Sequence, residues 1–188
     1  MRRRKSKGVY AFIDSQNLNV SVQKYGWKMN WKKFREFLRD KHGVTKAFMF
    51  IGYVPEHEDI YEKMHQAGYA VVLKPTFDMS RPRPEEQNGK SDKPVKGNID
   101  ADLVLWAMKE INKYEKAVIV SGDGDFFALV EYLVQQNKLQ KILTPTGQYS
   151  SLFHQFEDYI DRIDNHRREL AYHDRRTSKN NPPVKRSV

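Results

Sequence analysis

The sequence predicts an α/β domain in which a mainly parallel sheet is covered by helices. Short apolar runs rich in β-branched residues alternate with segments whose apolar residues recur at helical spacing. This alternation continues from residue 8 to residue 163 without an internal repeat. The first and fourth predicted strands lead into aspartates. If those two strands are neighbours, the strand order is 3-2-1-4-5 and the point where the order reverses lies between them.

The amino-terminal part of the chain supplies the first strand and an amphipathic helix. Residues 8–14 form the first predicted strand, and the polar residues 15–19 turn into a short helical segment. Residues 31–41 carry aromatic and apolar side chains on one helical face. Asn30 is positioned to cap that helix and Gly43 to end it.

The next part of the chain predicts two more strands and a long loop. Residues 44–54 form the second strand, residues 56–67 a helix and residues 69–73 the third strand. Ile60, Tyr61 and Met64 are expected to face inward from this helix. From residue 74 to residue 98 the periodicity disappears, and four prolines, two glycines and several bases follow one another. A loop of this length in a compact domain suggests a functional role, and it is a candidate lid over a ligand.

The remaining chain predicts a helix at residues 99–114 and a strand at residues 117–120, which ends in a sharp turn and another helix. The turn contains Asp123 between two glycines and Asp125 directly after the second. A purely structural interpretation makes Asp125 a helix N-cap and Asp123 a turn residue. A fifth strand at residues 139–143 and a helix from about residue 150 are expected to follow. Residues 159–163 are expected to form either a sixth strand or the continuation of that helix.

Four aspartates are expected at one edge of the sheet. Asp14 and Asp123 follow strand ends, Asp125 lies in the same turn, and Asp100 opens the helix after the long loop. Such carboxylates repel one another unless a cation neutralises them, and oxygen ligands without His or Cys favour Mg²⁺ or Mn²⁺. Asp102 is predicted to be a surface acid, because residues two apart do not share a helix face.

Several polar and basic residues are candidates for contacts with a phosphate. Asn17 and Ser121 are expected to hydrogen-bond to a phosphate or to a water on the metal. Lys96 is a candidate for a phosphate contact or a charge partner in the site. Other bases of the long loop are candidates for binding a nucleic-acid backbone, and they are Arg81, Arg83, Lys90 and Lys93.

The charge is concentrated at the two ends of the chain. Residues 1–7 and 166–188 together hold twelve Lys or Arg and two acidic residues, a net charge of +10, within a total of +9. We therefore divide the chain into a basic arm (1–7), one folded domain (8–165) and a basic tail (166–188). Polycationic ends favour a polyanionic partner such as nucleic acid, although they are also typical of solubilising tails.

The composition excludes several classes of protein. The chain has no cysteine, so disulfides, thiolate metal sites and a cysteine nucleophile are excluded. No apolar run is long enough for a membrane helix or a signal peptide, which predicts a cytoplasmic protein without membrane contact. The sequence has no P-loop motif and no dinucleotide fingerprint, so no nucleotide cofactor is expected. The residues after Asp14 and at the end of the third strand do not fit a haloacid-type phosphatase or a receiver domain.

Three segments stand out within residues 8–163, and they are FIDSQNL, KGNIDADLVLWAM and VIVSGDGDFFALVEYL. In this order they resemble the motifs of the NYN domain, a branch of the PIN-like nuclease superfamily that includes the LabA group. The resemblance implies a Rossmann-like three-layer fold and a Mg²⁺- or Mn²⁺-dependent ribonuclease site. It implies that the site residues are Asp14, Asn17, Asp100, Asp123 and Asp125. Where many members carry a further acid, this chain has Trp106.

The expected function is therefore hydrolysis of RNA phosphodiester bonds by a metal-dependent endoribonuclease. By analogy the products would carry 3′-hydroxyl and 5′-phosphate ends. The alternative is an RNA-binding regulatory module with a vestigial nuclease site. The tryptophan at position 106 favours that alternative, and the four aspartates oppose it.

Overall fold

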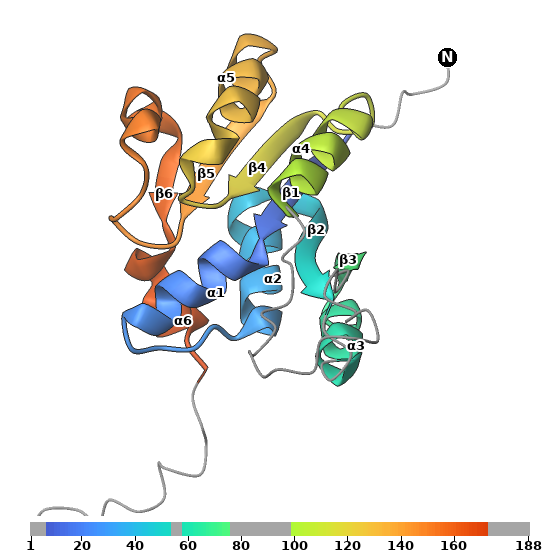
Figure 1. Ribbon diagram of the computed structural model, residues 1–188, viewed down its shortest axis with the longest axis vertical. Coiled ribbons are helices and arrows are strands. Elements are labelled where there is room, and N and C mark those ends of the chain that lie inside the picture. The colour runs from blue at the N-terminus through green and yellow to red at the C-terminus, as the bar shows by residue number, and fades with distance from the viewer. Residues whose placement is uncertain (1–6, 54–57, 76–98, 173–188) are drawn as a thin grey trace, which may run out of the picture.

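The computed structural model describes residues 7–53, 58–75 and 99–172, and it contains one sheet of six strands. The strands are β1 (Val9–Asp14), β2 (Val44–Tyr53), β3 (Tyr69–Pro75), β4 (Lys116–Val120), β5 (Leu139–Thr144) and β6 (Ile160–Arg162). Their order is β3-β2-β1-β4-β5-β6 and every pairing is parallel (Figure 1). The predicted α/β class and the order 3-2-1-4-5 are confirmed, and β6 extends the sheet by one strand.

Helices connect the strands. The α-helices are α1 (Ser15–Lys24), α2 (Trp31–His42), α3 (Glu58–Gln66), α4 (Ile99–Lys109), α5 (Phe127–Gln135) and α6 (Arg167–Leu170). Three 3₁₀ segments complete the described chain, and they are η2 (Gly124–Phe126), η3 (Ser151–Tyr159) and η4 (Ile163–His166). Within the described ranges, none of these helices has the length and apolar character needed to cross a bilayer.

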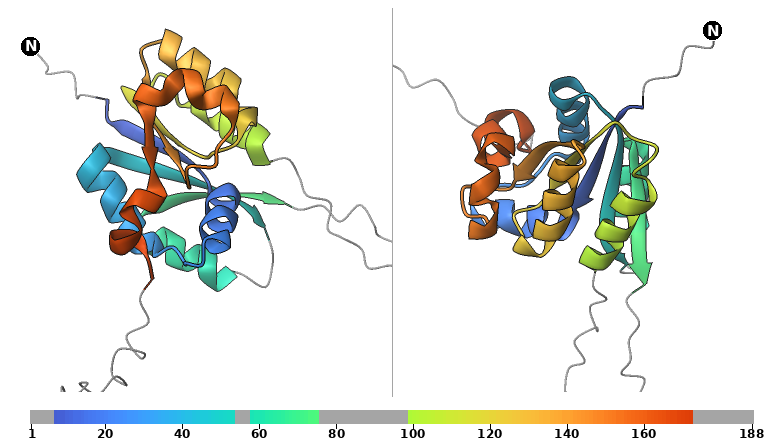
Figure 2. Two further views of the ribbon diagram at one scale, coloured as in Figure 1. Left: turned by 90° about the vertical axis from the view of Figure 1, so that its left-hand side faces the viewer. Right: turned by 90° about the horizontal axis from the view of Figure 1, so that it is seen from above.

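Two hydrophobic layers bury the two faces of the sheet. Ala11 and Ile13 of β1 face the layer formed with α1, α2, α3 and α6, whereas Phe12 between them faces the layer formed with α4, α5 and η3. The left view of Figure 2 shows these two sets of helices on opposite sides of the strands. Because successive side chains of a strand point to opposite faces, a strand buried on both faces reads as an uninterrupted apolar run.

The two ends of α2 lie where the sequence predicts its capping residues. The Asn30 side chain accepts a hydrogen bond from the Lys33 backbone N–H, and Gly43 ends α2 with a φ of 66°. After β1 the chain has no separate turn, because α1 begins at Ser15 with Asp14 as its N-cap. The side chain of Asp14 thus has a structural role in addition to its place at the sheet edge.

Two boundaries and the orientation of one side chain differ from the sequence expectation. Lys74 and Pro75 belong to β3 rather than to the following loop. The helix expected at residues 99–114 ends at Lys109, because a turn follows it and carries Tyr114 into the core, where it is fully buried. Ile60 does not face inward. It is 39% exposed, since the buried side of α3 is set by Tyr61 and Met64.

In the carboxyl-terminal part of the domain, the alternative of a sixth strand is confirmed, because residues 160–162 form β6. The helix expected from about residue 150 is η3, a 3₁₀ segment with a kink at Phe156. Residues 166–172, assigned above to a basic tail, pack against the domain. Leu170 is fully buried, its carbonyl accepts the Asn30 backbone N–H at 2.8 Å, and Ala171 bridges to Met29.

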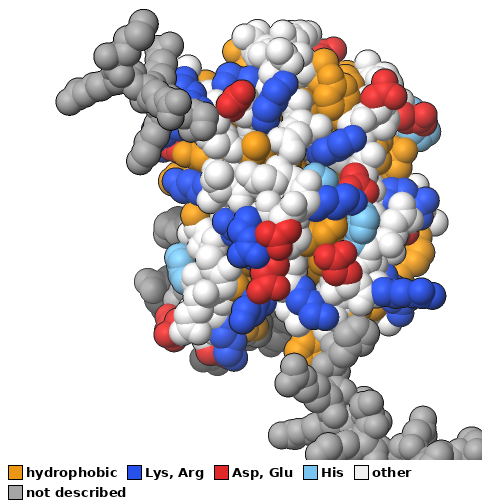
Figure 3. Space-filling model, turned by 180° about the vertical axis from the view of Figure 1, so that it is seen from behind, with side chains coloured by type: hydrophobic (Ala, Val, Ile, Leu, Met, Phe, Trp, Pro, Cys, Tyr) orange, Lys and Arg blue, Asp and Glu red, His pale blue; other side chains and the backbone are white. Residues whose placement is uncertain are grey.

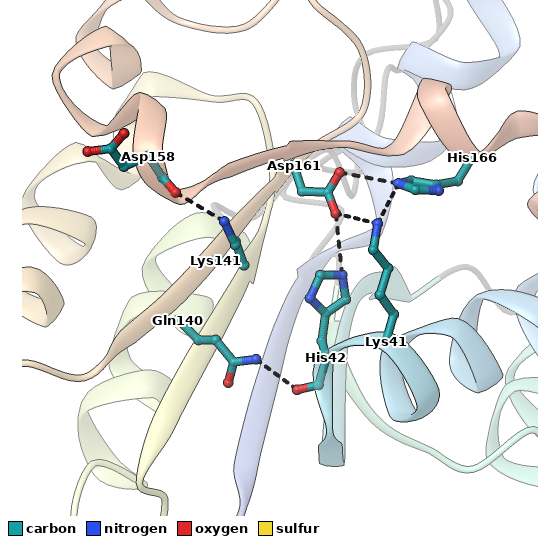
Figure 4. A network of polar contacts seen from close by, with 7 residues as sticks. All are labelled: Lys41, His42, Gln140, Lys141, Asp158, Asp161 and His166. Atoms are coloured by element: carbon teal, nitrogen blue, oxygen red, sulfur yellow. Dashed lines mark hydrogen bonds and ion pairs between the residues drawn. The ribbon is translucent and has the colours of Figure 1, made fainter.

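A polar network holds β6 and η4 against the end of α2 (Figure 4). The Asp161 carboxylate accepts from the Lys41 Nζ at 2.9 Å and contacts the His166 Nε2 at 3.2 Å. The buried His42 ring lies beside the same carboxylate, with 3.7 Å between Nε2 and the carboxylate oxygen. Elsewhere on the surface, the face seen in Figure 3 carries interspersed basic, acidic and histidine side chains.

The surroundings of His42 predict that the stability of the fold depends on pH. Burial lowers the pKa of His42 below its ordinary value of 6.5, and the charges of Lys41, His166 and Lys141 act in the same direction against Asp161. The unfolded chain therefore binds a proton at a pH where the folded chain does not, and stability falls as pH drops below 6.5. We expect His42→Gln to flatten the fall in melting temperature between neutral pH and pH 5. The exposed His65→Gln is the control and should leave the wild-type slope, and an equal slope in His42→Gln would contradict the assignment.

Candidate functional site

The carboxyl ends of β1 and β4 place two polar side chains side by side. The two strands are neighbours, with Ile13 paired to Val120, so Asp14 and Ser121 emerge together at the edge of the sheet. Asp14 is only 5% exposed and Ser121 is fully buried. This is the edge at which ligands bind in open α/β sheets, and the structure brings the two residues together as the sequence predicts.

Hydrogen bonds join the start of α1 to the turn after β4. The Ser121 hydroxyl donates to Asp14 Oδ2 at 3.2 Å and accepts the Asp123 backbone N–H at 3.1 Å. Asn17 donates its backbone N–H to Asp14 Oδ1 and accepts the Gly122 backbone N–H on its side-chain oxygen, both at 3.0 Å. Asn17 and Ser121 therefore hold Asp14 and the turn in one fixed arrangement.

The turn after β4 is capped by its first aspartate. The Asp123 side chain accepts the Asp125 backbone N–H at 3.0 Å and caps η2. The alternative in which Asp125 is the N-cap is therefore wrong, because Asp123 holds that position. Asp125 itself is exposed, and both carboxylates line one depression of the surface.

The two aspartates at the start of α4 behave differently. Asp102 forms an ion pair with Lys74 of β3, at 3.1 Å between Oδ2 and Nζ. Asp100 is half-buried, and its negative charge acts on Asp14. This difference agrees with the expectation that residues two apart on a helix face different surroundings. The carboxylate of Asp102 is thus paired with Lys74 of β3, whereas the charge of Asp100 acts on the candidate site.

The electrostatics of Asp14 indicate a convergence of negative charge. Burial raises the pKa of Asp14, and repulsion from Asp100 and Asp123 raises it further, against the hydrogen bonds from Asn17 and Ser121. Each of these causes except the hydrogen bonds disfavours the charged carboxylate. A cation bound at this edge would remove both the repulsion and part of the cost of burial.

A surface depression of about 840 Å³ opens beside Asp123 and Asp125. Four of its lining residues come from the segment after β5 and were not anticipated as site residues, and they are Gln148, Tyr149, Ser150 and Leu152. The sequence did contain a signal, because this turn follows the strand next to β4 and ends at the same edge. Leu152 is 49% exposed, so the depression offers an apolar as well as an acidic wall.

The segment after β5 packs tightly on the glycine turn. The Ser150 backbone N–H donates to the Gly122 carbonyl at 2.9 Å. A Cβ at Gly124 would meet the Ser150 hydroxyl, and one at Gly122 would lie 3.3 Å from Tyr149 Cβ. A side chain at Gly124 would therefore force the second segment to shift, whereas one at Gly122 would make a tight contact with it.

The residues present suit a cation that is shared with a substrate. Among the described residues, no three His, Cys, Asp or Glu side chains form a complete metal-binding group. Mg²⁺, however, is commonly held by one or two carboxylates together with waters and substrate phosphates. Asp14 and Asp123 supply oxygen donors of that kind, and the repulsion on the buried Asp14 from Asp100 and Asp123 gives an energetic reason for a cation.

Some predicted site residues cannot be placed. Lys96, Arg81, Arg83, Lys90 and Lys93 lie outside the described residues. Trp106 is described, and it packs on Phe48 with 5.4 Å between ring centroids, while the Lys109 Nζ lies 4.9 Å from its ring. The tryptophan therefore belongs to the packed layer between α4 and the sheet.

Comparison with known proteins places this arrangement in a family. The chain is 23% identical over 158 residues to the low amplitude and bright protein LabA of Synechococcus elongatus, covering 81% of this chain and 82% of that protein. It shares its fold with the crystal structure of a protein of unknown function from Vibrio parahaemolyticus RIMD 2210633. That match has a TM-score of 0.66 and 22% identity, and covers 92% of this chain and all of the other. The NYN domain model matches residues 8–170, and the chain therefore belongs to the NYN domain family.

Proposed function

We propose that this protein is a divalent-cation-dependent ribonuclease whose site is the edge formed by β1, β4 and α4. The proposal rests chiefly on the buried Asp14, on which the negative charges of Asp100 and Asp123 converge. Membership of the NYN family, part of the PIN-like nuclease superfamily, supports RNA hydrolysis as the reaction class. The sequence motifs led to the same expectation of a metal-dependent nuclease.

The depression beside the carboxylates explains why a cation is needed. Its described lining includes Asp123 and Asp125 but no Lys or Arg. A phosphodiester entering this space would be repelled by the two carboxylates and by Asp14 behind them. Neutralisation by Mg²⁺ or Mn²⁺ would convert the same surface into a phosphate-binding one.

The side chains of this protein have distinct roles in the proposed reaction. Asp14, Asp100, Asp123 and Asp125 would hold the cation, while Asn17 and Ser121 keep Asp14 and the turn in place. When bound, a divalent cation lowers the pKa of a water and stabilises charge on the transferring phosphate. Tyr149 and Leu152 form the wall against which a nucleotide beside the scissile bond would rest. Lys96, Arg81 and Arg83 would bind the RNA backbone, and RNA is the proposed partner.

An RNA-binding module with a vestigial nuclease site remains the second candidate. It is favoured by Trp106, which is packed on Phe48 at the position where many family members carry an acid. It is also favoured by the incomplete metal-binding group among the described side chains. The two candidates differ in turnover, because only the first predicts metal-dependent cleavage.

A pair of variants on α4 tests the proposal. We expect Asp100→Asn to lower the rate of RNA cleavage in Mg²⁺ or Mn²⁺ by about 10²-fold or more, because it removes a charged group from the site. Asp102→Asn, two residues away, changes the same chemical group but only breaks the ion pair with Lys74. Cleavage of a labelled single-stranded RNA would be followed for both variants and for the wild type.

The outcomes separate the two candidates. Cleavage that stops in EDTA, falls in Asp100→Asn and persists in Asp102→Asn would establish the nuclease at this edge. Binding of RNA without cleavage by the wild type, with either metal and several substrates, would refute the nuclease and favour the binding module. If Asp100→Asn were as active as Asp102→Asn and the wild type, Asp100 would not be part of the site.

A further inference from the structure

A second pocket lies at the other end of α1, away from the aspartates. It has a volume of about 530 Å³ and is formed by the turn after α1 together with α6 and the residues that follow it. The lining residues are Gly26, Trp27, Lys28, Arg167, Arg168, Ala171 and Tyr172. The function proposed above makes no use of this pocket.

The charged side chains that line the pocket are all basic among the described residues. Three of its lining residues are basic and, within the part of the chain that the structure describes, none is acidic, in contrast to the depression beside Asp123. Arg167 is held in place because its guanidinium donates to the Tyr25 and Gly26 carbonyls at 3.5 and 3.3 Å. The pocket therefore presents cationic donors close together, as an anionic ligand requires.

Aromatic side chains accompany the bases. Tyr172 is 60% exposed, and Trp27 is 6% exposed at the pocket wall. The Trp27 Nε1–H is buried and has no acceptor among the described residues. The pocket therefore combines basic side chains with two aromatic ones.

We propose that this pocket is a second RNA-binding site that takes one single-stranded nucleotide, with its phosphate on Lys28 and Arg168 and its base on Tyr172. A basic surface with an exposed aromatic side chain is the usual way in which proteins bind unpaired RNA without reading its sequence. The chain that continues from Tyr172 supports this choice, because residues 173–188 contain five Lys or Arg and one acid. The partner class rests on the proposed function, but the pocket itself does not.

Helix α1 sets the distance between the basic pocket and the aspartates. Asn17 in the first turn of α1 lines the acidic depression, and Gly26 just beyond the last turn lines the basic pocket. The ten residues of α1 span about 15 Å. An RNA bound at both sites must cover at least this distance, so a dinucleotide can occupy only one of them.

Fluorescence anisotropy with a labelled single-stranded RNA of about 16 nucleotides, in EDTA so that no cleavage occurs, tests the pocket. We expect the double variant Lys28→Glu/Arg168→Glu to weaken binding at least about tenfold and to make the salt dependence of binding shallower. The double variant Lys63→Glu/Lys109→Glu has the same change of charge on exposed residues of α3 and α4, and it should weaken binding much less. Thermal unfolding of both variants confirms that they are folded.

A third variant tests the stacking part of the proposal. Tyr172→Ala keeps the charge of the pocket and should lower RNA affinity about tenfold without changing the salt dependence. Equal affinity and salt slope in the pocket variant and the α3/α4 control would overturn the proposal. An unchanged affinity in Tyr172→Ala would overturn the placement of the base.

The cleavage assay distinguishes failure of this proposal from failure of the nuclease. The pocket variants should cleave a dinucleotide at the wild-type rate and lose cleavage only on the longer RNA. If the wild type does not cleave at all, the anisotropy results still decide whether the pocket binds RNA. If the pocket variants lose cleavage of the dinucleotide as well, the pocket is not a separate site and the proposal fails.

Discussion

Replacing Asp14 by Asn is expected to abolish metal-dependent RNA cleavage and, at the same time, to raise the melting temperature. Cleavage should fall by about 10³-fold or more, because the most buried carboxylate of the proposed cation site loses its charge. Stability should rise, because burial and the repulsion from Asp100 and Asp123 raise the pKa of Asp14. The folded protein therefore bears a cost for keeping this group ionised at neutral pH.

The hydrogen-bond pattern lets the amide replace the carboxylate. The introduced Oδ1 can still accept the Asn17 backbone N–H, and the introduced Nδ2 can donate to the Ser121 hydroxyl oxygen. We expect a gain of about 0.5–2 kcal/mol, the usual range of a single stabilising substitution. The gain should shrink as the pH approaches 3.8, since wild-type Asp14 becomes protonated and both chains then carry a neutral group.

Thermal unfolding with and without Mn²⁺ checks this prediction. The wild type should gain stability in Mn²⁺ because the ion binds the folded state, and Asp14→Asn should gain little. The control is Asp102→Asn, whose carboxylate is already neutralised by Lys74 and which should respond to Mn²⁺ as the wild type does. A lower melting temperature for Asp14→Asn would show that Asp14 stabilises the fold, contrary to the argument.

The central sheet could be predicted because its residues are unambiguous. The runs that became β1 and β4 are buried on both faces, and in parallel strands this produces continuous apolar sequence. The turn of Ser121, Gly122 and Asp123 marks the end of β4 equally clearly. Periodicity failed where tertiary packing decides the outcome, as at Tyr114, which looks like part of α4 but is buried beyond its end.

The sequence predicted the aspartates of the candidate site but not the residues that line the depression beside them. Asp14 and Asp123 follow strand ends, so the strand order alone brings them together. Tyr149 and Leu152 carry no chemical signature, and only their packing on Gly122 and Gly124 places them at the site. The basic pocket was also missed, because Trp27 and Arg167 are far apart in sequence and are brought to one pocket only when α6 docks against α2 and the turn after α1.

The second large effect is expected at Asp123, where two substitutions separate a structural role from a chemical one. The Asp123 side chain caps η2 by accepting the Asp125 backbone N–H, and it also faces the proposed cation site. Asp123→Asn keeps an acceptor oxygen for the cap but loses the charge. Asp123→Ala loses both, and a lost cap costs about 1 kcal/mol.

Both variants should therefore lose cleavage by about 10²–10³-fold, whereas only Asp123→Ala should unfold at a lower temperature. Cleavage rates in saturating Mn²⁺ and melting curves in EDTA would be measured side by side. Retained cleavage in Asp123→Asn with loss in Asp123→Ala would mean that the turn geometry, rather than the charge, supports the reaction. That result would shift the cation site toward Asp14 and Asp100, because a carboxylate that ligates a cation cannot be replaced by a neutral amide without loss of affinity.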